Sequence, residues 1–557
     1  MQPKPWPEVP AATARVARKA FRKGSLAIRA RDELGAWYSD ADFAAAYGVR
    51  GAPGMSPAQL AMVTVLQFTE NLTDRQAADA VRGRLDWKYA LGLPLEDEGF
   101  DFSVLSEFRS RLAAAGLERT LFDLLLERLK ELGLVKAGGT ARTDSTHVLG
   151  RIRDLNRLEL AGETVRAALE ALAAAAPDWL AGVIDASWQE VYGQRIDGMR
   201  LPASEAKRKD LASQYGRDGL VLLEAVRAPG APGWLRGLPA AEALRQVQVQ
   251  QYYRTERGAV VMREGKPGGQ GLPPGRSAII SPYDLDARYS EKRGRGWLGY
   301  KIHLTETCQV PGPDGSRDAP NLVTSVITTP ASTADVAMTT PVHDRLDAAG
   351  LAPAEHAADA GYASADELVT ARDRGIILTG PLRTTATRQR RTGGYTAEMF
   401  AIGWDRQQVT CPQGVTSATW CEHTRGGTSQ ILVRFPKAAC RTCPARAQCT
   451  TSATGRQLGL RPRPIHEAVT AARAEQATEA WKHRYSIRAG VEGTMWQATH
   501  VTGIRHARYL GLAKTSLEHN AAAAAINLIR FDAWQTGRPL DPTRTTCLQR
   551  LNLAPAA

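Results

Sequence analysis

Apolar residues recur every three or four positions along residues 56–135, which predicts a run of helices there. Ser56 and Thr73 each stand directly before such a run, and both residue types commonly cap helix N-termini. The residues that precede this region are basic and include several prolines. We therefore predict a basic N-terminal arm over residues 1–50 and a helical domain over residues 51–135.

Two parts of this helical domain suggest contact with DNA. Residues 72–78 are suited to open a helix-turn-helix unit, and residues 103–112 form a further amphipathic helix that carries Arg109 and Arg111. We predict that both arginines bind DNA. The alternative is a helical packing module whose arginines face water.

Strand-like and helical segments then alternate. Residues 139–149 are rich in β-branched side chains and predict a strand, whereas residues 154–250 are rich in Ala and Leu and predict helices. Residues 257–283 are rich in Gly and Pro and predict a loop. Strand character returns at residues 297–306 and 321–329, which we expect to pair as antiparallel neighbours.

The next segments complete a predicted core. A helix near residues 335–349 precedes a short strand that ends at Asp359, and a helix over residues 364–374 precedes a strand over residues 376–379. The order β, β, β, α, β, α, β predicts an α/β protein with an RNase H-like mixed sheet. The parts of this core are residues 136–153 and 284–382, interrupted by a helical insertion plus loop over residues 154–283.

The C-terminal third differs from the core in composition. Residues 383–465 are polar and contain cysteines, which predicts a small Cys-rich insertion. Residues 466–503 return to a helical period, and residues 516–534 predict an Ala-rich helix. We assign residues 466–535 to a catalytic helix and C-terminal helices, and residues 536–557 to a tail.

Composition narrows the choice of partner and compartment. The 557 residues carry a formal net charge of +13, which favours a polyanionic partner, although an Arg-rich solvated surface is the alternative. There is no run of about 18 apolar residues and no apolar signal-peptide core, so we expect no membrane partner. Seven cysteines in so long a chain do not indicate a disulfide scaffold. We expect a cytoplasmic protein with reduced thiols.

Two aspartates mark the predicted sheet. Asp144 lies in the middle of the first strand, where a charge is costly unless it is exposed or paired with a cation. Asp359 lies at the carboxyl end of the fourth strand, directly before Ala360 and Gly361, and ligands bind at such strand ends in open α/β sheets. The first and fourth strands are adjacent in the RNase H topology, so we expect the two carboxylates to be neighbours. A divalent ion would relieve their repulsion.

A third carboxylate is placed by helical spacing. Tyr485, Arg488 and Glu492 are separated by three and four residues, so we expect them on one helical face. Asp144, Asp359 and Glu492 together can hold a pair of divalent ions that activate a water or a sugar hydroxyl. Arg488 can contact a phosphate, and Tyr485 can contact or stack on the nucleic acid. The alternative is an ordinary amphipathic helix with an Arg–Glu pair.

Other basic residues are candidates for phosphate contacts. Arg505, Arg508 and Lys514 follow the helix of Glu492 closely in the sequence, and we predict that they bind DNA. A second group could grip DNA or lie in a solvated loop; it comprises Arg383, Arg388, Arg390 and Arg391.

The cysteines of the insertion are candidate zinc ligands. Cys440, Cys443 and Cys449 lie close together, and Cys411 begins a knuckle-like Cys-Pro-Gln-Gly turn upstream. Four thiolates can hold a structural zinc ion tetrahedrally. Cys421 could replace one ligand, and the alternative is a set of reduced thiols in a β-rich insertion.

These motifs resemble those of the DDE transposases of bacterial insertion sequences. The resemblance rests on Asp359-Ala-Gly361-Tyr362 and on Tyr485-x2-Arg488-x3-Glu492, and it covers most of residues 50–535. The family pattern often continues with a lysine seven residues after the glutamate, where this chain has Thr499.

The resemblance implies an RNase H-like catalytic domain with two Mg²⁺ or Mn²⁺ ions. It also implies recognition of the terminal inverted repeats of double-stranded DNA, cleavage and strand transfer, and a homodimer in a synaptic complex. Two rival interpretations are a nuclease of the same fold that cuts without joining, and a decayed transposase that only binds DNA.

Overall fold

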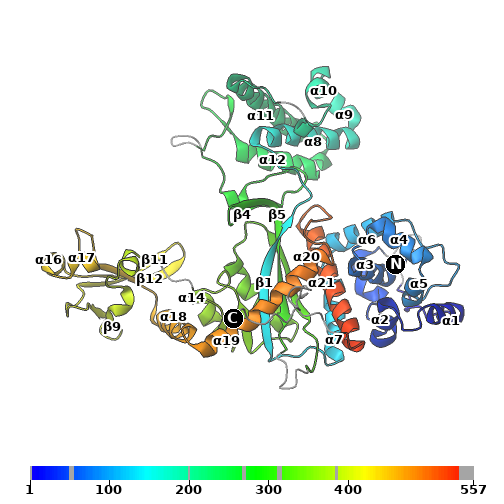
Figure 1. Ribbon diagram of the computed structural model, residues 1–557. Coiled ribbons are helices and arrows are strands. Elements are labelled where there is room, and N and C mark those ends of the chain that lie inside the picture. Colours follow the sequence, from blue (N-terminus) through cyan, green and yellow to red (C-terminus); the bar gives the residue numbers. More distant parts are fainter. Residues whose placement is uncertain are drawn as a thin grey trace, which may run out of the picture. The chain divides into compact units, whose positions relative to one another are not determined.

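The computed structural model describes residues 3–48, 55–198, 201–265, 271–309, 317–382 and 387–538 (Figure 1). The chain is an α/β protein with a mixed sheet and many helices, and it divides into two compact units. Unit 1 comprises Met1–Val135, Ser145–Thr333 and Glu492–Ala557, and unit 2 comprises Lys136–Asp144 and Ala334–Val491.

Residues 56–135 of unit 1 are helical, as predicted, and much of the segment predicted as a basic arm is also helical. The Ser56 hydroxyl accepts a hydrogen bond from the Gln59 N–H (3.2 Å), and Thr73 forms a capping box with Gln76, so both residues begin helices. The C-terminal helix packs against the third and seventh helices of this region, within the same unit. The helices are α1 (Ala11–Ala20), α2 (Leu26–Leu34), α3 (Pro57–Thr69), α4 (Asp74–Gly83), α5 (Leu85–Leu91), α6 (Ser103–Ala114), α7 (Thr120–Glu131) and α21 (Leu512–Gln535), with a 3₁₀ helix, η1, at Asp40–Ala46.

The stretch after β1 (Thr140–Leu149) forms helices that enclose a hydrophobic core of their own, with Leu222 and Leu235 fully buried. Glycine permits close approach inside it, since a Cβ on Gly216 would lie 2.6 Å from the Tyr252 ring. The elements, all in unit 1, are α8 (Arg157–Ala175), α9 (Pro177–Ala181), α10 (Ala186–Tyr192), α11 (Glu205–Arg227), α12 (Pro239–Gln251), the hairpin β2 (Tyr252–Arg254) and β3 (Val260–Met262), and the 3₁₀ turns η2 (Ile196–Gly198), η3 (Gly233–Gly237) and η4 (Gly275–Ser277).

The main sheet has the strand order β4-β5-β1-β7-β8, with β6 paired to β5. In unit 1, β5 and β6 are antiparallel from Tyr300↔Pro330 onward, as predicted. In unit 2, the first half of β1 runs parallel to β7, which runs parallel to β8. The strand β4 was not predicted. The remaining bounds are β4 (Arg288–Lys292), β5 (Arg295–Thr307), β6 (Val323–Pro330), β7 (Glu355–Ala358), β8 (Ile377–Thr379), η5 (Asp335–Met338), α13 (Thr339–Ala348) and α14 (Ala365–Asp373).

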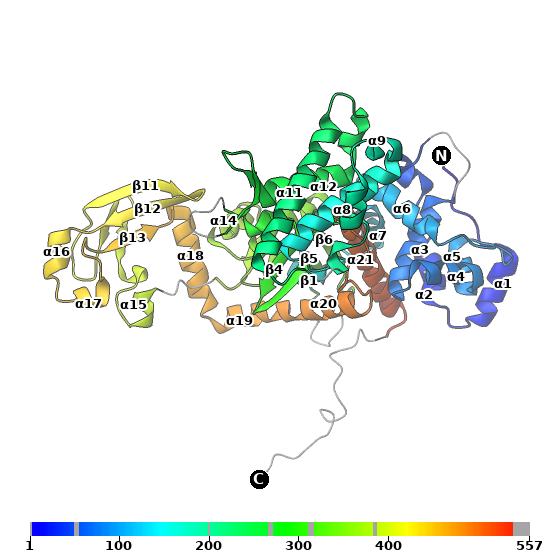
Figure 2. The same cartoon turned by 90° about the horizontal axis from the view of Figure 1, so that it is seen from above.

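The cysteine-containing part of unit 2 is a small β-rich module, and Figure 2 shows β11, β12 and β13 side by side in it. Helices come after it, and the predicted long helix begins at Arg463 and is broken by a 3₁₀ turn, η7 (Ile487–Gly490). The elements are α15 (Arg388–Arg391), η6 (Ala397–Met399), β9 (Ala401–Gly403), β10 (Gln408–Thr410), β11 (Thr419–Arg425), β12 (Thr428–Arg434), α16 (Lys437–Thr442), α17 (Arg446–Cys449), β13 (Gln457–Leu460), α18 (Arg463–Gln476), α19 (Glu479–Ser486) and α20 (Val491–His500).

Two expectations concern residues with uncertain placement. Arg383 and nearly all of the predicted tail, which includes Cys547, lie outside the described residues. Among the described residues, no helix is both long enough and apolar enough to cross a membrane.

Candidate active site

Asp144 and Asp359 occupy neighbouring positions in unit 2, Asp144 within β1 and Asp359 directly after the end of β7. The last pair of residues in the parallel register of β1 and β7 is Thr143↔Ala358, and each aspartate is the next residue of its strand. Adjacent strands lie about 4.8 Å apart, so the backbones of the two aspartates are close. The predicted adjacency of these two strands is confirmed. Asp144 is buried, with 7% of its surface exposed.

The turn after β7 fixes the carboxylate of Asp359. The Gly361 N–H donates to Asp359 Oδ1 at 2.7 Å, and the Tyr362 N–H donates to the Asp359 carbonyl at 3.1 Å. Tyr362 is fully buried, and its carbonyl accepts from the Thr339 hydroxyl at 2.9 Å. The Gly-Tyr pair of the motif therefore orients the aspartate and anchors the turn in the core.

Asp335 is an acidic residue of this site that the sequence motifs did not indicate. A Cβ added to Gly361 would lie 2.8 Å from Asp359 Oδ1 and 3.2 Å from Asp335 Oδ2. The two carboxylates thus converge on Gly361, where only glycine leaves room for both. The need for glycine after Asp359 was the one signal in the sequence that a second group approaches this turn.

Arg488 provides a positive charge within the same unit. Its Nη2 lies 2.5 Å from Asp144 Oδ2, in an ion pair that is largely buried. Arg142, on β1, donates from Nη1 to the Ile487 carbonyl at 2.7 Å, and its guanidinium lies where a Cβ on Gly490 would have to be placed. The strand of Asp144 therefore holds the turn η7 through two arginine contacts.

A neutral chain of hydrogen bonds supports the strands behind Asp144. The Thr143 hydroxyl lies 2.6 Å from His356 Nε2, and His356 Nδ1 lies 2.8 Å from His343 Nε2. Burial lowers the pKa of His356 to about 3 and that of His343 to about 4. Both rings are therefore uncharged near neutral pH and add no positive charge to the site.

Glu492 follows η7 on α20, and its side chain is exposed. The expected single helical face is not continuous, because Tyr485 lies on α19, Arg488 on η7 and Glu492 on α20. The Tyr485 ring stacks on Trp481 with centroids 4.9 Å apart. In the described part of the chain, no three His, Cys, Asp or Glu side chains form a preset metal site.

Arg109, which we predicted to bind DNA, has the environment of a packing residue. Its side chain is 3% exposed, its two terminal nitrogens bond to the Asp74 carboxylate, and its guanidinium lies 4.4 Å from the centre of the Tyr509 ring. These contacts favour a packing role for Arg109 over the predicted DNA contact. Arg111, two residues later, is 48% exposed and stays a candidate.

The other basic residues that we predicted to bind DNA differ in the contacts that they make within unit 1. Arg508 donates to the Leu72 carbonyl at 2.7 Å and lies over the Phe68 ring, so it ties the motif tail to the turn between α3 and α4. Arg505 donates to the His147 carbonyl at 2.8 Å, at the second half of β1. Lys514 lies in the first turn of α21 and is half-buried.

An exposed aromatic residue on α20 was not anticipated. Trp496 is 59% exposed and stacks on His500, with ring centroids 5.0 Å apart. It follows Glu492 by four residues on the same helix, so both face the same side. Its spacing from Glu492 could have identified it, because an exposed tryptophan beside a catalytic candidate is a stacking surface for a base.

Residues 410–531 match the family model of a transposase DDE domain, and residues 19–111 match that of a transposase domain called DUF772. No curated protein and no solved structure matches the chain. These two family matches support a DDE transposase of an insertion sequence.

The matched ranges include Glu492 but neither aspartate. The strand register that brings Asp144 beside Asp359 is therefore an observation independent of the family matches.

Proposed function

We propose that this protein binds the terminal inverted repeats of its insertion sequence and catalyses metal-dependent DNA cleavage and strand transfer. Asp144, Asp359 and Glu492 are the proposed catalytic carboxylates. The observation that carries the proposal is that Asp144, within β1, and Asp359, directly after β7, each follow the last paired residues of these two parallel strands. Two like charges brought together in this way favour a bound cation.

The strand order supports an RNase H-like core. On one side of β1 lies β5, which pairs antiparallel with β6, and on the other side β7 runs parallel to β1 and β8 runs parallel to β7. The long helical insertion lies between β1 and β4 in the sequence, so it does not change the order in which these strands follow one another along the chain. This order is the one expected from the sequence.

The donor set fits Mg²⁺ or Mn²⁺, because carboxylate oxygens are the preferred ligands of both ions. Asp144, Asp359 and Glu492 would hold two such ions. When bound, the ions lower the pKa of the attacking water or 3′-hydroxyl and stabilise the leaving oxygen.

Residues around the carboxylates orient them and engage DNA. Arg488 holds Asp144 at 2.5 Å and is a phosphate contact once DNA is present. Arg142 fixes the turn that carries Arg488, and the hydrogen bonds of Gly361 fix Asp359. These contacts keep the carboxylates in one arrangement before substrate arrives, which reduces the entropic cost of assembling the site.

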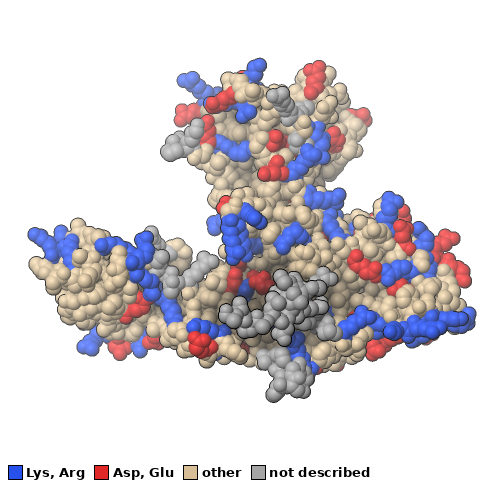
Figure 3. Space-filling view, in the orientation of Figure 1, with Lys and Arg blue, Asp and Glu red and all other residues tan. Residues whose placement is uncertain are grey.

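Double-stranded DNA is the proposed partner. The net charge of +13 supports this, and basic side chains are spread over the visible face in Figure 3, with a group over α1 at the lower right. The proposed contacts are Tyr485, Arg488, Arg505, Arg508, Lys514 and Arg111. We propose that a homodimer brings two element ends together in a synaptic complex.

A cleavage assay tests this function. Purified protein is incubated with Mg²⁺, a duplex that carries the inverted repeats of its own element, and a target plasmid. We expect nicks at the repeat ends and DNA joined to the plasmid. Asp359→Asn should abolish both products while DNA affinity is retained.

The matched control is Asp366→Asn, which changes an exposed aspartate on α14 of the same unit and should remain active. Cleavage without joined product would instead identify a nuclease. Binding without cleavage by the wild-type protein would identify a non-catalytic DNA-binding protein and would overturn the proposal.

A further inference from the structure

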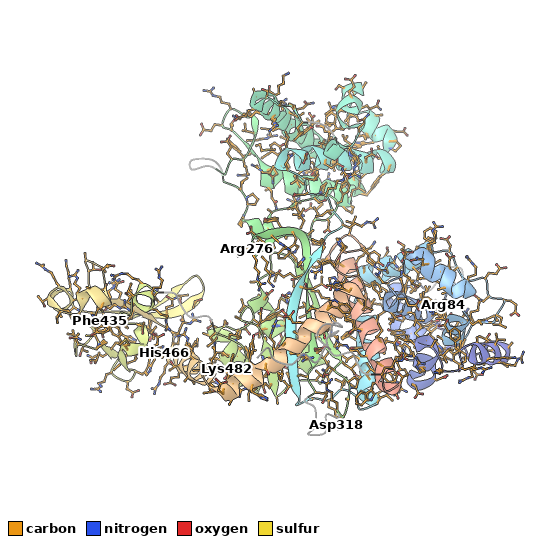
Figure 4. All side chains as sticks on the ribbon, viewed as in Figure 1. Arg84, Arg276, Asp318, Phe435, His466 and Lys482 are labelled. Carbon is orange, nitrogen blue, oxygen red and sulfur yellow. The ribbon has the colours of Figure 1, made fainter. Side chains whose placement is uncertain are left out.

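Four cysteines meet in the small β-rich module of unit 2. A cavity of about 30 Å³ is lined by all four of them, together with Tyr395, Phe435 and Arg456 among others. Figure 4 labels Phe435, which is 3% exposed and belongs to the core of this module. The lining residues come from α16, α17 and the segments that connect the elements of the module, and the cysteines are Cys411, Cys440, Cys443 and Cys449.

The first cysteine lies in a tight turn. The Gly414 N–H donates to the Cys411 carbonyl at 2.8 Å, and the Cys411 N–H donates to the Val415 carbonyl at 2.8 Å. Gly414 has a φ of +79°, a conformation that favours glycine. The Cys-Pro-Gln-Gly sequence therefore folds into a compact loop that presents the Cys411 side chain to the cavity.

The other three cysteines come from two short helices. Cys440 lies on α16, Cys443 ends that helix, and Cys449 ends α17, where its N–H donates to the Ala445 carbonyl at 3.1 Å. Helix ends hold these side chains at fixed positions around the cavity. Cys421 differs from all four, because it lies on β11 and is exposed.

A metal ion stabilises the thiolates that it coordinates, so a cavity lined by four cysteines is suited to a soft divalent ion. The four cysteines are free thiols rather than disulfides in the structure.

The module also has few other sources of stability. Its buried core consists of seven apolar residues, to which Cys411, Cys440 and Cys449 add partly buried contacts. Small modules with such cores commonly depend on a metal or on disulfides.

We propose that Cys411, Cys440, Cys443 and Cys449 bind one structural Zn²⁺ ion. Four sulfur ligands select zinc among the common divalent ions, and a site with no open position is structural rather than catalytic. Because no preset group of three or more ligands is present in the described residues, binding draws the thiolates together around the ion and couples metal affinity to closure of the module.

The test measures metal in full-length protein purified without added zinc. We expect one zinc per chain by elemental mass spectrometry, lost in Cys411→Ser and in Cys443→Ser. Cys421→Ser and Cys308→Ser are matched controls, since neither cysteine lines the cavity, and both variants should keep the ion. Zinc retained in the Cys411 and Cys443 variants, or lost from the Cys421 variant, would overturn the ligand assignment.

A second measurement on the wild-type protein does not depend on how the variants fold. Replacement of zinc by Co²⁺ should produce the strong sulfur-to-cobalt charge-transfer absorption of a tetrathiolate site. A wild-type protein that contains no zinc and gives no such band after reconstitution, or whose four cysteines are found in disulfides, would overturn the proposal. Neither measurement uses DNA, so the result is independent of the proposed transposase activity.

Discussion

Two regions of the molecule use charged residues in opposite ways. At the strand ends of unit 2, the fold brings carboxylates together, with Asp359 and Asp335 converging on Gly361 and Asp144 on the next strand. In unit 1, the fold brings opposite charges together, as in the pair of Arg530 and Glu306. Gathered like charges favour a further cation, although Arg488 already neutralises one of these carboxylates, Asp144, whereas matched opposite charges require nothing more. The cluster of carboxylates therefore indicates a site that binds a cation, and the pair of opposite charges indicates a structural role in packing.

Substitution within the buried ion pair of Arg530 and Glu306 in unit 1 should give the largest change in stability. Arg530 is 8% exposed and donates to Glu306 at 2.6 Å and to the Thr494 hydroxyl at 2.6 Å. Arg530→Met leaves the fully buried Glu306 without its cation, and we expect a loss of about 3–5 kcal/mol in the free energy of unfolding.

Urea unfolding followed by circular dichroism measures this loss. The double variant Arg530→Met, Glu306→Gln is the control, and it should recover much of the stability. A loss below about 1 kcal/mol in the single variant would contradict a packing role for the pair.

A buried acid on α21 predicts a pH dependence for the same region. Burial raises the pKa of Glu518 to about 7. The unfolded chain releases this proton near the ordinary pKa of glutamate, whereas the folded chain keeps it up to about pH 7. The contribution of the protonated group to the free energy of unfolding is therefore fully present below the ordinary glutamate pKa, and it is lost as the pH rises toward 7. We expect Glu518→Gln to be more stable than wild type at pH 8, by up to about 3 kcal/mol. Thermal unfolding at pH 5 and pH 8 checks this, and equal shifts at both pH values would contradict it.

Arg109, which is buried, and Arg111, which is exposed, allow a role in packing and a role in DNA binding to be tested separately. Arg109→Ala breaks a buried ion pair with Asp74, and we expect it to cost about 2–3 kcal/mol of stability while the folded protein binds DNA normally. Arg111→Ala should barely change stability and should reduce the salt dependence of DNA binding by about one unit of slope. Unfolding curves and binding at several salt concentrations separate the two. A reduced salt slope in the Arg109 variant would restore that residue as a DNA contact.

The smallest expected effect concerns Trp496. Loss of a stacking surface in Trp496→Ala should weaken binding to element-end DNA by about 1–2 kcal/mol, and Trp496→Phe should restore most of it. Trp234→Ala removes a comparably exposed tryptophan, 54% against 59%, from the helical insertion and serves as control. Equal losses from both variants in a fluorescence-anisotropy titration would mean that Trp496 has no special role.

Features that depend on local patterns were largely predictable from the sequence. Helix caps at Ser56 and Thr73, the pairing of β5 with β6, and the adjacency of the Asp144 and Asp359 strands were all predicted, because capping chemistry, side-chain alternation and strand order are readable along the chain. The short strand β4 was missed, since its residues are polar and half of them face solvent.

Features that the sequence did not predict depend on contacts between distant segments. Arg109 and Arg111 lie on the same amphipathic helix. Arg109 is buried because it contacts Asp74 and Tyr509, which come from other parts of the sequence. The role of Asp335 is equally invisible, because it depends on a turn that lies 24 residues later. The 3₁₀ turn η7 interrupts a helix that the sequence pattern predicts to be continuous. Arg142 donates a hydrogen bond to the Ile487 carbonyl, in this turn.

The proposed function requires that Asp144, Asp359 and Glu492 hold the same pair of metal ions. Fe²⁺ can replace Mg²⁺ among carboxylate ligands, and with ascorbate and peroxide it generates radicals that cleave the nearby backbone. We predict cleavage of the wild-type chain close to residues 144, 359 and 492, suppressed by excess Mg²⁺ and lost in Asp359→Asn. Cleavage that is confined to one of these segments, or that persists unchanged in Asp359→Asn, would contradict a shared site.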